Sequence, residues 1–163
     1  MKLFNIILLS LFFVLFADAK EKKPIDINID NISAQAKIES KHTVLYFHMT
    51  YCPYCKKMAK FTFKNKDIKK QLDKNFLFVD INIDDDDNIR YKNFFDSKKQ
   101  FAKHLAVNFY PTVIFIDEEN TIVYILKGYR TKDKFNIVLG YIKSKSYLDM
   151  NLEEYIDELE FNK

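Results

Sequence analysis

The chain contains few residues of the kinds that loosen or interrupt a fold. Among its 163 residues only two are glycine and three are proline. Hydrophobic residues make up 48% of the chain and aromatic residues 16%, which is typical of a folded protein and argues against global disorder. A chain of this length has room for one domain with a full hydrophobic core. We therefore expect a single folded domain.

The chain also lacks long blocks of like charge. Its net charge is +3 and its isoelectric point about 8.6, with acidic and basic residues mixed along the sequence. This is not the pattern of a nucleic-acid-binding protein. The one acidic run, residues 84–87, consists of four aspartates. It lacks the glycine and the distal glutamate of an EF-hand, which favours a solvated loop over a calcium site.

No apolar stretch is long enough for a membrane-spanning helix. The longest, residues 6–16, is broken only by Ser10, whereas a spanning helix needs about 20 apolar residues. Lys2 precedes this stretch and Ala-Asp-Ala at residues 17–19 follows it, which together are the three parts of a secretory signal. We expect residues 1–19 to be a signal peptide cleaved before Lys20. With no cysteine at the cleavage point, neither a lipid anchor nor any other membrane anchor is expected afterwards.

The chain has only two cysteines, Cys52 and Cys55, and both lie in one Cys-x-x-Cys sequence. Structural zinc takes four ligands, so a zinc site is the weaker interpretation without a second pair, and no metal is expected. A disulfide that closes so short a loop removes little entropy from the unfolded chain, which makes a structural staple a poor explanation. Exported thiols are either paired structurally or used in exchange. Exchange chemistry is therefore favoured.

The hydrophobic pattern predicts alternating strands and helices. Residues 20–29 carry isoleucine at every second position near their end, as in a short edge strand or an extended arm. β-Branched and aromatic runs predict strands at residues 43–48, 76–83, 113–116 and 121–126. The last two flank a turn and are expected to form a hairpin. Helices are predicted at residues 31–41, 54–63 (continuing in broken form through 67–73), 135–144 and 151–161.

One segment is harder to assign. Residues 84–106 are expected to be a polar loop followed by a helix. Four side chains supply the apolar stripe of that helix: Phe94, Phe95, Phe101 and Leu105. The resulting order of strand, helix, strand, helix, hairpin and helix predicts a mixed α/β sheet covered by helices on both faces.

The position of the two cysteines suits thiol chemistry. Residues three positions apart at a helix start lie on one face, with β-carbons about 5 to 6 Å apart, so a small adjustment closes a disulfide. Unpaired backbone N–H groups and the helix dipole stabilise a thiolate on the first cysteine. Cys52 is therefore the candidate nucleophile. Cys55 is the candidate resolving cysteine, which attacks Cys52 to release the substrate.

A strand leading into Cys-Pro-Tyr-Cys at residues 52–55, with Tyr-Pro-Thr at residues 110–112 before a hairpin, resembles the thioredoxin superfamily. The resemblance covers residues 44–142 and is greatest to exported thioredoxin-like proteins related to SoxW and to the catalytic domain of DsbC. It implies a thioredoxin fold, with a central mixed sheet of four to five strands flanked by helices on both faces. We expect one domain at residues 20–163, with a core at 31–145 and a C-terminal helical extension at 146–163.

The resemblance also implies a substrate-binding segment. It implies a cis peptide bond before Pro111, facing the cysteines, and a neighbouring backbone that pairs with substrate like an added strand. The residues it assigns besides the cysteines are Tyr110, Pro111 and Thr112 for substrate binding, with Pro53 and Tyr54 in support.

Several positions depart from cytoplasmic thioredoxin. Tyr46 stands where that family has a buried aspartate, Tyr51 replaces a tryptophan, and Asp80 stands in place of a lysine on the next strand. Asp80 is either an acceptor for the Cys55 proton or an acid at the strand edge with no such role. His48 likewise either lends a charge to the site or is an ordinary strand-end histidine. Glutaredoxins share the Cys-Pro-Tyr-Cys sequence, but their Gly-Gly-Asp after the hairpin is absent here.

The resulting functional prediction is a periplasmic thiol:disulfide oxidoreductase that reduces or isomerises disulfides in exported proteins. It needs no cofactor, acts as a monomer and is recharged by a membrane electron donor of DsbD type. One alternative is a DsbA-like dithiol oxidase, although the stretch before Pro111 is short for that family's inserted helical domain. Another is a redox-inactive binding or chaperone module that uses the Pro111 groove.

Overall fold

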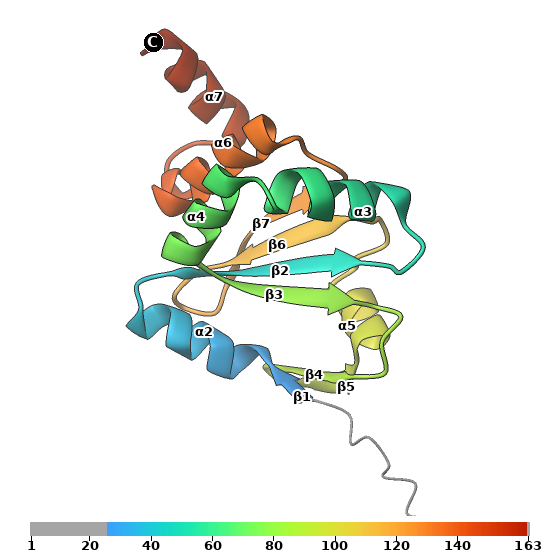
Figure 1. The fold of residues 1–163 in the computed structure, drawn as a ribbon. Helices are drawn as coiled ribbons and strands as arrows, with labels where there is room; N and C mark the ends of the chain where they lie inside the picture. Colours follow the sequence, from blue (N-terminus) through green and yellow to red (C-terminus); the bar gives the residue numbers. More distant parts are fainter. Residues whose placement is uncertain (1–25, 163) are drawn as a thin grey trace, which may run out of the picture.

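The computed structural model describes residues 26–162, which form two sheets and the helices that cover them (Figure 1). The expected signal peptide and residues 20–25 of the expected arm lie outside the described residues. Within them, no helix is both long enough and apolar enough to cross a bilayer. The elements are β1 Asp26–Asn28, α2 Ile29–Ile38, β2 His42–His48, α3 Pro53–Met58, η1 Ala59–Phe63, α4 Lys66–Asn75, β3 Phe76–Asn82, β4 Asn88–Tyr91, β5 Phe94–Ser97, α5 Lys98–His104, β6 Thr112–Ile116, β7 Ile122–Lys127, α6 Lys132–Lys143, η2 Ser146–Leu148 and α7 Leu152–Phe161.

The larger sheet has four strands in the order β3-β2-β6-β7. β2 runs parallel to β3 and antiparallel to β6, and β6 pairs with β7 as the expected hairpin. β2 is buried along all but its last residue, because it lies inside the sheet and is covered on both faces. The predicted central mixed sheet is confirmed.

Each face of this sheet has its own hydrophobic cluster. Helices α3, α4 and α6 cover one face, where Met58, Leu72 and Leu139 pack on sheet residues such as Val44. Helices α2 and α5 cover the other face together with the smaller sheet, and Phe101 packs there on Phe47. Figure 1 shows the two layers on opposite sides of the four strands. The expectation of helices on both faces is confirmed.

The smaller sheet corrects the expectation for residues 84–106. These residues form strands β4 and β5 before the helix, and β1 completes a sheet in the order β1-β4-β5. Phe94 and Phe95 therefore lie on a strand, and the helix α5 begins only at Lys98. The physical reason is pairing: β4 gains β1 as a parallel neighbour, while Ile89 and Tyr91 point into the second cluster.

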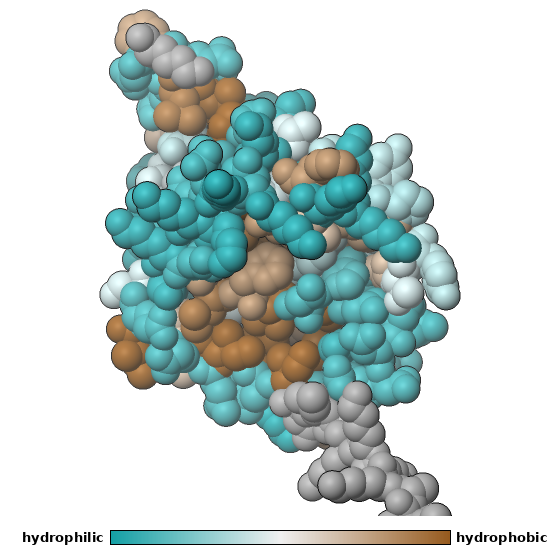
Figure 2. All heavy atoms as spheres, viewed as in Figure 1, coloured by the Kyte–Doolittle hydropathy of each residue, from teal (hydrophilic) through white to brown (hydrophobic). Residues whose placement is uncertain are grey.

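The C-terminal helix α7 is attached to α6 but not enclosed by the domain. Asn151 caps its first turn in a reciprocal capping box with Glu154, and the Tyr155 ring packs 5.4 Å from that of Tyr141. None of its residues is buried. The helix projects from the body in Figure 1, and hydrophobic side chains are visible on it in Figure 2.

Candidate redox site

The Cys-x-x-Cys sequence connects the end of β2 to the start of α3. Cys52 is the N-cap of α3, with an extended backbone, and its Sγ accepts a hydrogen bond from the backbone N–H of Cys55 at 3.1 Å. Pro53 occupies the first helical turn, where its fixed φ suits a helix and its missing N–H costs no bond. The local sequence therefore places both sulfurs at the helix start.

The two cysteines form a disulfide, with Cα atoms 5.2 Å apart, inside the range that such a bond requires. Their accessibilities differ. Cys52 retains 9% of its accessible surface and Cys55 only 2%. Cys52 is therefore the more accessible of the two to a substrate disulfide.

The Tyr-Pro-Thr segment lies at the same end of the sheet as the cysteines. Thr112 begins β6 and pairs with Phe47 near the end of β2, so the antiparallel arrangement places residues 110–112 beside the cysteine loop. The Tyr110–Pro111 peptide bond is cis. The Pro111 carbonyl accepts a hydrogen bond from the Gly128 N–H at 2.8 Å.

Two local features hold this segment in place. The Thr112 hydroxyl donates to the Phe109 carbonyl at 2.7 Å, which ties the strand start to the preceding turn. Gly128 follows β7 with a φ of +87°, a backbone conformation that residues other than glycine rarely adopt. The residue after β7 that donates a hydrogen bond to Pro111 is therefore one that tolerates a positive φ.

Beneath the disulfide, Tyr46 takes the place expected of a buried acid. Its hydroxyl donates a hydrogen bond to the Cys55 carbonyl at 2.9 Å. Its ring meets that of Phe63 edge-on at 4.7 Å. Burial, aided by the charge of Asp80, raises the pKa of Tyr46 well above its usual value. Tyr46 therefore remains a neutral donor that fixes α3 to the sheet.

His48 and Asp80, whose roles the sequence left open, contact each other. Asp80 lies directly opposite Tyr46 in the parallel β2–β3 register, and its Oδ1 is hydrogen-bonded to Nε2 of His48. The His48 ring also stacks on Tyr46, with centroids 4.9 Å apart. Both side chains line a pocket of about 210 Å³ that is also lined by Cys55. No local sequence signal predicts this pair, because its members lie on different strands.

Exposed aromatic side chains flank the site. Tyr51 is 87% exposed, Tyr54 61% and Phe109 57%. Lysine ammonium groups lie over neighbouring rings: that of Lys56 is 5.7 Å from the Tyr51 centroid. Tyr54 was expected to support the site, whereas sequence reasoning missed Phe109. Exposed rings next to a reactive sulfur offer apolar contact area to a polypeptide.

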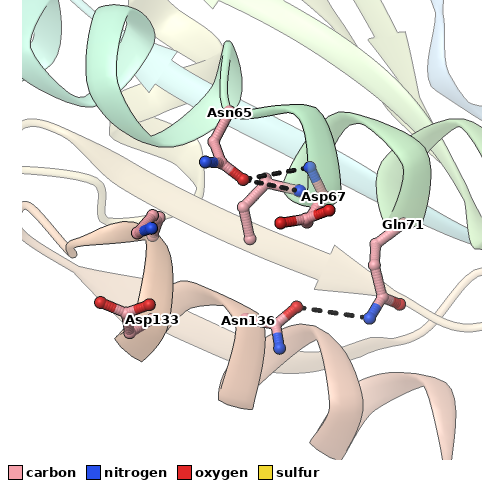
Figure 3. A pocket seen from close by; sticks show the side chains of 7 residues that line it. Asn65, Asp67, Gln71, Asp133 and Asn136 are labelled. Atoms are coloured by element: carbon pink, nitrogen blue, oxygen red, sulfur yellow. Dashed lines mark hydrogen bonds between the residues drawn. The ribbon is translucent and has the colours of Figure 1, made fainter.

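A second hollow lies away from the cysteines, between α4 and α6 (Figure 3). Its volume is about 280 Å³. Asn65 caps α4 through the N–H groups of Asp67 and Ile68, and Gln71 donates to Asn136 at 3.3 Å. These polar groups already serve helix capping and packing, and no cysteine lies among the residues that line the hollow.

The acidic run at residues 84–87 is tied to the protein by hydrogen bonds. Lys98 contacts the carboxylates of Asp85 and Asp87 at 2.9 and 2.7 Å, and the Thr50 N–H donates to Asp84 at 2.8 Å. Across residues 26–162, no group of three or more histidine, cysteine or acidic side chains is arranged to hold a metal ion. Through the bond between Asp84 and Thr50, the run stabilises the loop that precedes the cysteines.

A mixed sheet between two helical layers, with a Cys-x-x-Cys disulfide at the start of a helix, defines a thioredoxin-fold protein of the thiol:disulfide oxidoreductase type. The family described as thioredoxin-like domain matches residues 29–143, and the chain belongs to it. This confirms the resemblance read from residues 44–142. A search of curated protein sequences gives no match.

Solved structures agree with this assignment. A thioredoxin-fold protein from Helicobacter pylori is 26% identical, with a TM-score of 0.64 over 76% of this chain and 87% of that one. A thioredoxin from Thermus thermophilus is 20% identical, with a TM-score of 0.56 over 73% and 86%. The DsbH oxidoreductase is 15% identical, with a TM-score of 0.50 over 78% and 88%. At 20% and 15% identity, the last two structures show only that the fold is shared.

Proposed function

We propose that this protein reduces or isomerises disulfides in exported proteins in the periplasm, through Cys52 and Cys55. The observation that carries the proposal is the unequal exposure of the two sulfur-bearing residues, 9% and 2%, at a helix start beside exposed aromatic rings. The secretory-signal pattern of residues 1–19 supports the location. A membrane electron donor of DsbD type would keep the pair reduced.

The reaction follows from this geometry. In the reduced protein the Cys52 thiolate attacks one sulfur of a substrate disulfide, and the other substrate sulfur leaves as a thiolate. Cys55 then attacks Cys52, re-forming the disulfide seen in this structure and releasing the second substrate sulfur. In isomerisation the substrate's own thiol attacks the mixed disulfide instead, which returns Cys52 unchanged.

The test compares the wild-type protein with Cys52→Ser and Cys55→Ser in the reduction of insulin by dithiothreitol. Acceleration by the wild type that is lost in Cys52→Ser supports the proposal, and Cys55→Ser should accumulate mixed disulfides. No acceleration by the wild type would indicate a redox-inactive binding module. A stoichiometric zinc ion on the reduced protein would also overturn the proposal.

The direction of electron flow is tested by the reduction potential. Equilibration of the Cys52–Cys55 pair with a glutathione buffer should give a value nearer the roughly −270 mV of reducing thioredoxins than the roughly −120 mV of DsbA. A value near the latter would identify a dithiol oxidase. N-terminal sequencing of protein recovered from the periplasm should begin at Lys20, and an intact Met1 would contradict export by cleavage.

A further inference from the structure

The buried resolving cysteine has a protonation problem that its surroundings must solve. Cys55 retains 2% of its accessible surface, and burial in apolar surroundings favours the protonated thiol. Only the thiolate can attack Cys52 in a mixed disulfide. If the protein works as proposed above, the thiol proton has to pass to a neighbouring group.

The neighbouring groups share the pocket of about 210 Å³ beside Cys55. Its titratable or charged side chains are Tyr46 and His48 from β2, Asp80 from β3 and Lys56 from α3, besides Cys55 itself. All of them lie on the face of the larger sheet that α3 covers. Residues 46 and 48 point to that face of β2, and Asp80 is paired with Tyr46 on β3. Among the residues that line the pocket, these four are the candidate acceptors of the proton.

Two of the four are poor acceptors. The Tyr46 hydroxyl already donates to the Cys55 carbonyl, and burial raises the pKa of Tyr46, so it is a neutral donor. Lys56 carries an ammonium group, which has three donors and no lone pair, and this group lies over the Tyr51 ring at 5.7 Å. The hydrogen-bonded pair of His48 and Asp80 remains.

The pair has the properties of a proton acceptor. A neutral imidazole has one unprotonated ring nitrogen that can accept a proton, and histidine is the side chain that most often serves as a general base. Asp80 engages Nε2 of His48, while stacking on Tyr46 orients the ring, which leaves Nδ1 to accept a proton. The His48 side chain is 21% exposed and that of Asp80 63%, so the proton can continue to solvent.

We propose that His48 accepts the proton of Cys55 across this pocket, with Asp80 as its positioning residue. The Cys55 S–H bond breaks and an N–H bond forms on His48. The Cys55 thiolate then forms the bond to Cys52, the bond between Cys52 and the substrate sulfur breaks, and the substrate leaves as a thiolate. His48 returns its proton to that thiolate or to solvent, so no further reactant is consumed.

The test separates the two attacks in one experiment. The reduced protein is mixed with excess dithiobis(nitrobenzoate), which releases one coloured thiolate when Cys52 attacks and a second when Cys55 closes the disulfide. The first phase depends on reagent concentration and the second does not. The variants are His48→Gln, His48→Asn and Asp80→Asn. His104→Gln is the matched control, because His104 is exposed and stacks on Phe94 in another part of the domain.

The expected result is confined to the second phase. Both His48 variants should slow it on the order of 100-fold at neutral pH, the usual effect of losing a general base, and should remove its inflection between about pH 5 and 8. Asp80→Asn should slow it less, because His48 keeps its imidazole and loses only the carboxylate that orients the ring. The first-phase rate constant, the release of two thiolates per protein and the unfolding midpoint should match those of His104→Gln.

Three outcomes would overturn the inference. One is that both His48 variants keep the wild-type rate and pH profile in the second kinetic phase. The second is an equal slowing of both phases, which would indicate a structural role. The third is loss of the neutral inflection in Lys56→Gln rather than in the His48 variants. A wild-type protein with a rapid second phase but no activity on insulin would refute the proposed function while leaving this inference standing.

Discussion

The hydroxyl of Tyr46 donates a hydrogen bond to the backbone carbonyl of Cys55, with 2.9 Å between the two oxygens. The bond joins a central strand to the helix that carries the resolving cysteine. The π-helix η1, Ala59–Phe63, continues α3 and brings Phe63 edge-on to the same ring. Tyr46 thus contacts the segment formed by α3 and η1 at two residues, Cys55 and Phe63.

Replacing Tyr46 with phenylalanine should lower the free energy of unfolding of the oxidised protein by about 1 kcal/mol, the net contribution of a typical hydrogen bond. The loss is limited because the Cys55 carbonyl also accepts from the Ala59 N–H. Urea unfolding measures it. Tyr51→Phe is the control, since Tyr51 is 87% exposed, and equal changes in the two variants would contradict the prediction.

Tyr46 should also make the free energy of unfolding depend on pH in the alkaline range. Burial raises the pKa of Tyr46 in the folded protein, and Asp80 adds to the shift, whereas in the unfolded chain a tyrosine titrates near about pH 10. The unfolded state therefore loses its proton first. The stabilisation is complete below about pH 10 and is lost as the pH rises towards the folded-state pKa.

Urea unfolding between pH 8 and pH 11 should accordingly show a free energy of unfolding that falls steeply at the alkaline end. Tyr46→Phe should fall less steeply. Burial also raises the pKa values of Tyr124 and Tyr147, so some decline should persist in the variant. Parallel curves for the two proteins would show that Tyr46 is not responsible.

Lys98 should matter more to stability than an exposed lysine does. Its side chain is 5% exposed and contacts the carboxylates of Asp85 and Asp87. Burial lowers the pKa of Lys98, but the hydrogen bonds that its ammonium group donates to the two carboxylates outweigh that effect and raise the pKa overall. Lys98→Met would leave two acids facing each other, at a cost of about 2 kcal/mol after allowance for their partial exposure.

Urea unfolding again provides the measurement, and Lys37→Met provides the matched control. Lys37 pairs with Glu119 on the surface, with side chains 57% and 70% exposed, and solvent-exposed pairs of this kind contribute little to stability. Adding Asp85→Asn to Lys98→Met should recover part of the loss. No recovery would mean that packing of the lysine stem, rather than its charge, is what stabilises the loop.

The exposed aromatic rings near the cysteines should affect protein substrates selectively. Tyr51→Ala and Phe109→Ala should each raise the KM for a polypeptide disulfide roughly ten-fold, or about 1.4 kcal/mol, as aromatic contact residues often do. The first-phase rate with dithiobis(nitrobenzoate) should not change, because a small reagent needs only the sulfur. Phe161→Ala is the control: Phe161 is 91% exposed but lies on α7. Equal effects on both substrates would point to altered thiol reactivity instead.

The chemistry-bearing part of this protein could be predicted because its signals are local. A strand of buried β-branched and aromatic residues, followed at once by Cys-Pro-Tyr-Cys and a helix-forming segment, specifies strand, turn and helix through residues a few positions apart. The structure has this order, with β2 ending at His48 and α3 beginning at Pro53. The place of Asp80 on the strand next to Tyr46 came instead from the resemblance to thioredoxin, and the structure pairs the two residues in the parallel register.

The small sheet could not be predicted in this way. The four-residue strands β4 and β5 are too short for a clear periodic signal, and β4 is a strand because the distant β1 and the second hydrophobic cluster support it. Phe94 and Phe95 fit a helical stripe as well as a strand until those partners are in place.

The sequence alone thus determined that two thiols lie at a helix start, because backbone conformation there depends on neighbouring residues. Only the tertiary structure decided which groups surround them. His48 and Asp80 meet, and Lys98 joins the acidic loop, because packing of the sheets and helices brings together side chains that are remote in the chain. Local pattern fixes the conformation of a segment, whereas the contacts between segments depend on burial of the whole core.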